Sequence, residues 1–288
     1  MRHNNVLVLF LLASVACGVD IDAIPPITVA TPEGDGGGVD AGRTEGGAEG
    51  GDSGPDAHAD APEPLRDAAP TIACAPFVSP PDFETAGNWQ LRGNALGVAA
   101  GGVQVVQLTE DRGAQKGAVW WNAPATAGLQ GFDAKLTFSV VNSGIAADGL
   151  ALAWVASSAV PGVGDTSGNL GICNGDHKSL EGYAVLVDTY RTGSGVRLVR
   201  VSDCSTVAAA GSNVVAPLPA GLIDGKQHTL AVSLRPAAFS VTIDATMVLT
   251  AGATAAMPSG PVYFGATAAT GGFNSKHVAH ELAVSTCR

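Results

Sequence analysis

The chain between residues 103 and 285 is a succession of short apolar or alternating runs, separated by clusters of Gly, Pro, Asn and Asp. Short runs bounded by turn-forming residues are typical of β-strands. No window shows a 3.6-residue apolar period with helix-capping signals at its ends. The pattern predicts an all-β sandwich of jelly-roll type. The predicted strands are 103–109, 117–121, 134–141, 149–156, 183–190, 196–201, 228–234, 239–243, 262–266 and 280–285.

The predicted strands are of two kinds. Residues 150–155 and 184–187 are continuous apolar stretches, which indicates central strands that are covered on both faces. Residues 135–140 and 240–244 alternate between apolar and polar side chains, which turns one face toward solvent. Residues 73–288 number 216, a size at which a β-sandwich is routinely one domain, and we expect a single domain there.

The N-terminus has the features of a bacterial secretory signal over residues 1–17. A basic start at Arg2 precedes an apolar run at residues 6–12 and a small-residue ending. The apolar run is far shorter than the roughly 20 residues that span a bilayer, so we do not expect a transmembrane anchor. The segment predicts an exported protein.

Cys17 follows Ser14-Val15-Ala16, and this segment is similar to a lipobox. Acylation of Cys17 would make the chain a lipoprotein of the outer membrane or cell surface, because each buried methylene adds about 0.8 kcal/mol of membrane affinity. The alternative is ordinary signal cleavage after Ala16, which also fits the small residues. That alternative would give a secreted or periplasmic protein.

Residues 18–72 form a segment rich in Gly, Asp, Ala and Pro. Twelve acidic residues against Arg43 and Arg66 give it about −10 of the chain's formal charge of −11. Low hydrophobicity with charge of one sign predicts a disordered linker that tethers the domain. The remaining charge on residues 73–288 is near −2. Nucleic acid is therefore not an expected partner, because its phosphates demand a basic face.

Four cysteines besides Cys17 lie in the predicted domain. An even number of cysteines in an exported protein predicts a framework of two disulfides, for which three connectivities are possible. Free thiols or a metal site are less expected, because no Cys-x-x-Cys pair or nearby His pair is present. The four are Cys74, Cys173, Cys204 and Cys287.

Several short segments occur in an order that resembles the L-type, legume-like lectin family, whose fold is a concanavalin A-like sandwich. The resemblance covers most of residues 75–288 and rests on the order and spacing of the segments rather than on any one of them. The segments are 105–109 (VVQLT), 115–121 (QKGAVWW), 131–138 (GFDAKLTF), 146–152 (AADGLAL), 183–190 (YAVLVDTY) and 265–272 (GATAATGG).

The resemblance implies which cysteines pair. In the lectin fold the first and last strands lie side by side, which would bring Cys74 beside Cys287 and leave Cys173 to pair with Cys204. A bridge that closes a loop of roughly 200 residues is worth about 4–5 kcal/mol in the chain-entropy model.

The resemblance also implies a carbohydrate site. Asp148 matches the aspartate that accepts hydrogen bonds from sugar hydroxyls in the family, where the preceding peptide bond is cis. Hydrogen bonds to an ionised carboxylate are about twice as strong as neutral ones. The alternative for Asp148 is a simple turn residue. The other implied sugar contacts lie in two loops and are Gly168, Asn169, Gly271, Gly272, Phe273 and Asn274.

The calcium motif of the family is only partly kept. The family pattern is roughly Glu-x-Asp-x-aromatic-x-Asn, with Asp and His downstream. The four named positions of this pattern are occupied here by Leu186, Asp188, Tyr190 and Thr192. Without the Glu and His, a transition-metal site is not expected. A degenerate calcium site would consist of Asp188, the Tyr190 carbonyl, the Thr192 hydroxyl and waters, although calcium takes six to eight oxygen ligands. The alternative is that Asp188 is a turn and hydrogen-bonding residue, so calcium is a doubtful cofactor.

The sequence thus predicts a non-catalytic carbohydrate-binding protein with a glycan or polysaccharide partner, and a membrane contact through Cys17 if it is acylated. One alternative is a structural or adhesion sandwich that has lost sugar and metal binding. A glycoside hydrolase is less expected, because such enzymes place two carboxylates about 5–10 Å apart. None of the domain's glutamates is paired at strand spacing; these are Glu84, Glu110, Glu181 and Glu281.

Overall fold

The computed structural model describes residues 72–126, 128–142, 144–190, 195–207, 215–251 and 257–288. The predicted signal segment with Cys17, the predicted linker up to residue 71, and Thr192 lie outside the described residues, so export, lipidation and the linker stay predictions. Within the described part of the chain, no helix has the length and apolar character needed to cross a membrane.

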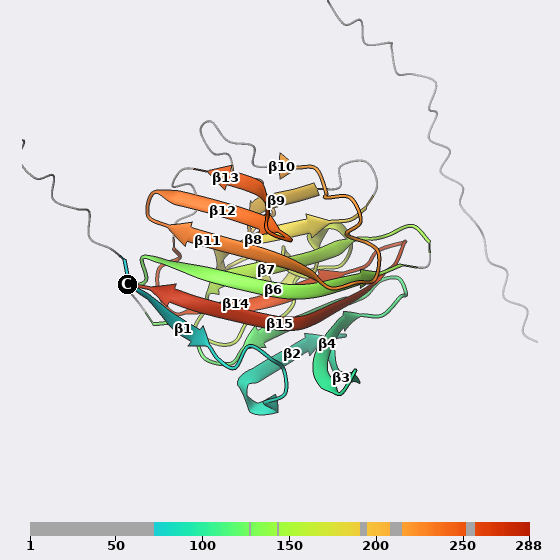
Figure 1. The fold of residues 1–288 in the computed structure, drawn as a ribbon, viewed down its shortest axis with the longest axis horizontal. Coiled ribbons are helices and arrows are strands. Elements are labelled where there is room, and N and C mark those ends of the chain that lie inside the picture. Colours follow the sequence, from blue (N-terminus) through green and yellow to red (C-terminus); the bar gives the residue numbers. More distant parts are fainter. Residues whose placement is uncertain (1–71, 127, 143, 191–194, 208–214, 252–256) are drawn as a thin grey trace, which may run out of the picture. The chain divides into compact units, whose positions relative to one another are not determined.

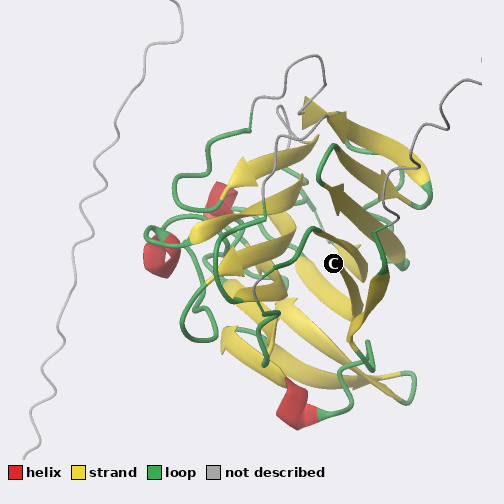
Figure 2. Ribbon diagram, turned by 90° about the vertical axis from the view of Figure 1, so that its left-hand side faces the viewer, coloured by secondary structure: helices red, strands yellow, loops and turns green. Residues whose placement is uncertain are grey.

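Two antiparallel sheets pack face to face (Figures 1 and 2). One has the strand order β13-β12-β11-β6-β15-β4-β3 with β1 paired to β15, and the other has the order β10-β9-β8-β7-β14-β5-β2. This arrangement confirms the predicted all-β sandwich. The strands are β1 Cys74–Val78, β2 Trp89–Gly93, β3 Leu96–Ala100, β4 Val103–Thr109, β5 Lys116–Trp121, β6 Gly131–Val141, β7 Gly149–Ala156, β8 Glu181–Asp188, β9 Gly195–Arg200, β10 Val215–Ala216, β11 His228–Arg235, β12 Ala238–Ile243, β13 Thr246–Ala251, β14 Val262–Ala269 and β15 Lys276–Cys287; the 3-10 turns are η1 Ala86–Asn88, η2 Ser167–Asn169 and η3 Gly175–His177.

Every predicted strand is present, and together they are the inner strands of the two sheets. The sequence pattern predicts none of the outermost strands β2, β3, β10 and β13, nor the short β1. The two that end the larger sheet, β3 and β13, leave most of their side chains exposed or half-buried. Their sequences, LGVAA and TMVLTA, contain apolar residues but do not alternate strictly, and a short run of this kind is an ambiguous signal for a strand.

Aromatic side chains fill the space between the sheets. The Phe132 ring of β6 lies 5.0 Å from Trp154 of β7 and 5.1 Å from Phe264 of β14, measured between ring centroids. Along β6, Phe132 and Leu136 are buried, whereas Lys135 is exposed, as the alternation predicts. Burial of each large apolar side chain contributes about 1.5–3 kcal/mol, and this layer holds the two sheets together.

A second apolar cluster explains why β7 and β8 are apolar on both faces. Leu170 and Ile172, from the connection between β7 and β8, pack on Trp120 of β5 and on the alanines of β7. The Cys173–Cys204 disulfide joins this connection to the turn after β9. The other disulfide, Cys74–Cys287, joins β1 to the end of β15. The pairing that the resemblance implies is confirmed.

Candidate functional site

Three strand ends meet at Asp148. The next residue, Gly149, opens β7 and is paired with Asp188 at the end of β8 and with Ala269 at the end of β14. Because both neighbours run antiparallel to β7, their C-terminal ends lie beside its N-terminal end. Asp148, Asp188 and the loop after Ala269 therefore come together, although they are far apart in the sequence.

The backbone around Asp148 is held on both sides. The peptide bond before Asp148 is cis, as the resemblance implies. The Asp148 N–H donates to the Ala269 carbonyl oxygen at 3.1 Å, and the Asp148 carbonyl accepts the Thr189 N–H at 2.9 Å. Gly149 has a φ of 140°, and a Cβ there would overlap the carbonyl oxygen of Val187, so only glycine fits. These contacts fix the direction of the Asp148 side chain.

The Asp148 carboxylate is buried, with 5% of the residue exposed. Its Oδ2 has no hydrogen-bond partner among the described residues. A Cβ built on Gly271 would lie 2.9 Å from this oxygen and 2.8 Å from Ser167 Oγ, so glycine allows the last loop to approach the carboxylate. Burial raises the pKa of Asp148 to about 6, and the negative charge of Asp188 adds to the rise. This oxygen is suited to accept hydrogen bonds from a ligand's hydroxyl groups.

Asp188 is already bound by protein donors. Its Oδ1 accepts the Tyr190 N–H at 3.1 Å, and its Oδ2 accepts Arg197 Nη2 at 3.1 Å. Burial raises the pKa of Asp188, while the Tyr190 amide and the positive charge of Arg197 oppose the rise. A calcium ion bound there would have to share the Asp188 oxygens with these donors and lie close to a guanidinium of the same sign of charge. The described residues around Asp188 therefore do not fit calcium.

Arg197 belongs to no local motif, although its place beside Asp188 follows from the pairing of two strands. Arg197 of β9 is paired with Leu186 of β8, and Asp188 lies two residues further along β8 on the same face. A long side chain reaches such a diagonal neighbour. Finding this contact requires the register of β8 against β9, which no local motif states.

The loop after β14 presents an aromatic surface beside Asp148. The Phe273 ring stacks on the Tyr190 ring with centroids 5.6 Å apart and planes 28° from parallel, and Phe273 is 37% exposed. A Cβ on Gly272 would meet open space. The Asn274 amide donates to Asp111 Oδ1 at 2.7 Å, which anchors the loop. Phe273 and Gly272 thus border the surface, while the Asn274 side chain has a structural contact.

The loop around η2 forms another wall of the site. Ser167 lies closest to Gly271, and its N–H donates to the Thr270 carbonyl oxygen at 3.4 Å. Like Arg197, Ser167 is not among the predicted site residues. A Cβ at Gly168 would meet open space. The Asn169 side chain accepts a hydrogen bond from Asn174 Nδ2 at 2.9 Å, within its own loop. Gly168 is therefore at the open surface, and the Asn169 side chain holds the loop.

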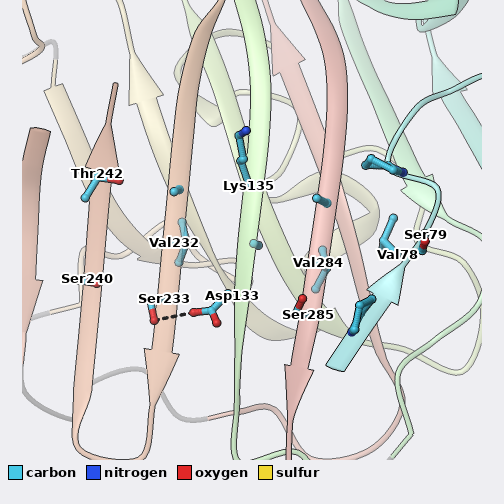
Figure 3. Close-up of a pocket in the computed structure, with 15 residues that line it drawn as sticks. Val78, Ser79, Asp133, Lys135, Val232, Ser233, Ser240, Thr242, Val284 and Ser285 are labelled. Carbon is cyan, nitrogen blue, oxygen red and sulfur yellow. Dashed lines mark hydrogen bonds between the residues drawn. The ribbon is translucent and has the colours of Figure 1, made fainter. Parts of the chain in front are cut away.

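A groove with a cavity volume of about 460 Å³ lies elsewhere, on the larger sheet (Figure 3). Residues of β1, β6, β11, β12 and β15 line it, whereas Asp148 and Asp188 lie at strand ends of the other sheet. Its one carboxylate, Asp133, is bound by Ser233 at 2.8 Å and by Arg235 at 2.7 Å. Small hydroxyl and aliphatic side chains make up most of the remaining lining. The groove lacks the chemistry found beside Asp148.

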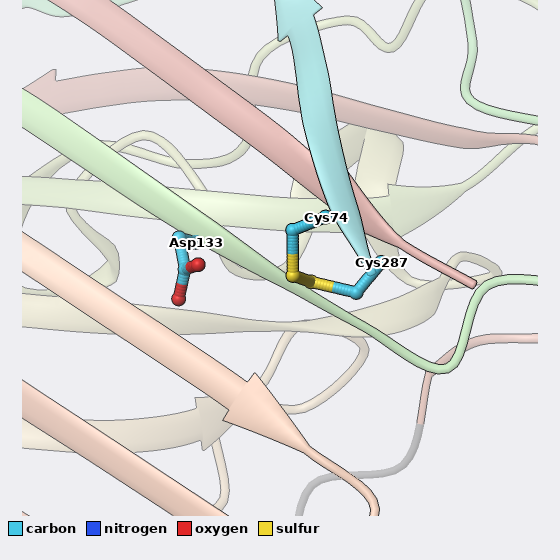
Figure 4. A group of neighbouring side chains, drawn as sticks. All are labelled: Cys74, Asp133 and Cys287. Carbon is cyan, nitrogen blue, oxygen red and sulfur yellow. A yellow bond between two sulfur atoms is a disulfide. The ribbon is translucent and has the colours of Figure 1, made fainter. Parts of the chain in front are cut away.

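Asp133 also lies near Cys74 and Cys287 (Figure 4). Both sulfur atoms are joined in the Cys74–Cys287 disulfide and cannot act as thiolate ligands. The group is therefore not a metal centre.

The fold and the loop cluster around Asp148 define a lectin-type β-sandwich. The sequence model of the legume-like lectin family matches residues 75–233, more than half of the chain, and the chain belongs to this family. A comparison with curated proteins finds no match.

Solved structures give the same fold. The exoplasmic/lumenal domain of VIP36 with bound Ca²⁺ and mannose has a TM-score of 0.54 and 20% identity, over 73% of this chain and 88% of that one. The Emp47p carbohydrate recognition domain has a TM-score of 0.55 and 20% identity, over 72% and 93% of the two chains. The lectin from Bauhinia forficata in complex with GalNAc has a TM-score of 0.58 and 16% identity, over 75% and 98%.

Proposed function

We propose that this domain is a non-catalytic carbohydrate-binding domain whose main polar contact is the Asp148 carboxylate. Sugar hydroxyls donate to Asp148 Oδ2, the backbone of Gly271 and Gly168 borders the sugar, and the apolar face of the ring packs on Phe273. Membership of the legume-like lectin family and the fold shared with the VIP36 and Emp47p domains support this assignment.

One observation carries the proposal. Asp148 Oδ2 is buried and lacks a protein hydrogen-bond donor among the described residues, beside an exposed aromatic side chain. A buried carboxylate without donors is unfavourable, and a ligand that supplies hydroxyl donors removes that cost. A turn aspartate with a purely structural role would instead use its oxygens on nearby backbone N–H groups.

A glycan array tests the proposal, followed by calorimetric titration of the best-bound glycan. We expect Asp148→Asn to weaken binding by about 2–3 kcal/mol, roughly 30-fold or more, because a charged acceptor is lost. The matched control is Asp165→Asn, which removes a half-exposed carboxylate that lies just before η2 and 3.9 Å from Lys116 Nζ, and it should bind as the parent does. Unchanged affinity of Asp148→Asn would reject the site. No bound glycan for the parent under any condition would favour a structural or adhesion role, and hydrolysis of a polysaccharide would overturn both.

The location of the domain is a separate part of the proposal. Three sequence features support an exported lipoprotein that presents the domain on a tether. They are the signal-like segment 1–17, the lipobox-like position of Cys17 and the acidic, Gly-rich segment 18–72. Labelling with a fatty acid tests this. We expect the label on the parent and its loss in Cys17→Ser. Equal labelling of both would reject Cys17 as the acylated residue, and an unlabelled parent would support ordinary cleavage and a secreted or periplasmic protein.

A further inference from the structure

The site contains two carboxylates at adjacent strand ends. Gly149, next to Asp148, is paired with Asp188, and the charge of Asp188 acts on Asp148. Both side chains are largely withdrawn from water. Two neighbouring buried negative charges repel each other, so a positive charge nearby stabilises the ionised pair. That charge comes either from a bound cation or from the chain itself.

Arg197 places a permanent positive charge at this position. Its Nη2 lies 3.1 Å from Asp188 Oδ2, and the two side chains are only 30% and 14% exposed. The pairing of Asp188 with Gly195 and of Leu186 with Arg197 fixes the two strands that carry the ion pair. A guanidinium stays charged at all physiological pH values and binds carboxylates directionally. Arg197 therefore provides a permanent positive charge beside Asp188, whereas a metal ion would provide positive charge only while it is bound.

The same ion pair is connected to the aromatic surface. Arg197 holds Asp188 Oδ2, Asp188 Oδ1 accepts the Tyr190 N–H, and the Tyr190 ring stacks on Phe273. Each contact in this series restrains the next group. The series links the charge on β9 to the surface on which we place the sugar ring.

We propose that Arg197 is a positioning residue that takes the place of calcium, so that glycan binding at Asp148 is independent of metal ions. This inference rests on the proposed carbohydrate-binding function. It separates this chain from the VIP36 domain, for which Ca²⁺-bound forms with mannose are known.

The test combines glycan titrations with calcium titrations of the full chain. We expect the parent to bind its best glycan with the same affinity, within about twofold, in calcium-containing and EDTA-containing buffer. Arg197→Met keeps an unbranched side chain against Leu186 without the charge, and it should lose at least tenfold in affinity. Arg197→Lys keeps the charge and should recover most of the binding. The matched control Arg200→Ala changes an exposed arginine at the end of the same strand and should have no effect.

Calcium titration of the parent without glycan provides an independent readout. We expect no calcium binding by the parent and measurable binding by Arg197→Asp, which adds a third carboxylate beside Asp148 and Asp188. Calcium binding by the parent, or loss of glycan binding in EDTA, would overturn the inference and leave the proposed function standing. A parent that binds no glycan with or without calcium would refute the proposed function and with it the role of Arg197 in sugar binding.

Discussion

Replacement of Asp148 by asparagine should stabilise the fold while it weakens glycan binding. The substitution keeps the size of the side chain and removes its charge. Because the Asp148 pKa rises from 3.8 to about 6 on folding, the ionised carboxylate destabilises the folded state at neutral pH. A shift of about two units corresponds to roughly 3 kcal/mol. Allowing for the partner groups that asparagine must find, we expect a net stabilisation of about 2 kcal/mol.

The gain should depend on pH with a definite sign. A carboxyl group with a raised folded-state pKa costs no stability below its unfolded pKa, and its cost grows as the pH rises from about 4 to about 6. Asp148→Asn and the parent should therefore have equal stability near pH 4 and differ fully at pH 7. For a domain of roughly 200 residues, 2 kcal/mol raises Tm by about 4–8 °C.

Urea unfolding and calorimetry across this pH range provide the assay. Asp165→Asn, which removes a half-exposed carboxylate 3.9 Å from Lys116 Nζ, is the control and should stay within about 0.5 kcal/mol of the parent at every pH. If Asp148→Asn is as stable as the parent at pH 7, or if the difference does not vary with pH, then Asp148 is not a buried, uncompensated charge. The argument that a ligand must supply its donors would then fail.

Three further predictions concern other parts of the domain. Burial lowers the pKa of His228, but hydrogen bonds to two aspartates outweigh this effect and raise the pKa overall. The stabilising contribution of His228, about 1 kcal/mol, should therefore be complete near pH 6 and disappear as the pH rises through the raised pKa. Urea unfolding of His228→Gln against the parent measures this contribution. The double variant Cys173→Ser with Cys204→Ser should lose about 3–4 kcal/mol in the chain-entropy model, measured by the same method, and an unchanged midpoint would contradict it. Phe273→Ala should weaken glycan binding about tenfold in titrations while Tm stays within a degree or two, because the ring is 37% exposed.

The extent to which the fold could be predicted follows from burial. The inner strands, such as β7 and β8, carry apolar side chains because both of their faces are covered, and the sequence records this directly. The outermost strands β3 and β13 are held by backbone hydrogen bonds to a single neighbour and leave most side chains exposed or half-buried. Their short runs, LGVAA and TMVLTA, contain apolar residues but do not alternate strictly, so hydrophobicity alone does not identify them as strands. Edge strands of this kind are therefore harder to predict than the strands of the core.

The candidate site divides in the same way. Asp148 and Gly271 can be found from short motifs, because each adjoins a buried strand and belongs to a recognisable segment. Ser167 and Arg197 cannot, because their neighbours are set by a loop packed on the sheet and by the register of two strands. The two residues that local sequence misses are thus those whose position depends on tertiary structure.

The charges at the strand ends favour the proposed binding role of this site over a purely structural one. Arg197 can neutralise the charge of one carboxylate, that of Asp188. If stability alone determined the sequence, we would expect asparagine at position 148, because it would give a more stable chain. Asp188 is neutralised by Arg197, whereas Asp148 keeps an oxygen that has no donor among the residues the structure describes. Residues that break a local stability rule tend to mark functional sites. The excess charge on Asp148 is accounted for if its missing donors come from a glycan, and the opposite effects expected for Asp148→Asn on stability and on binding follow from this single cause.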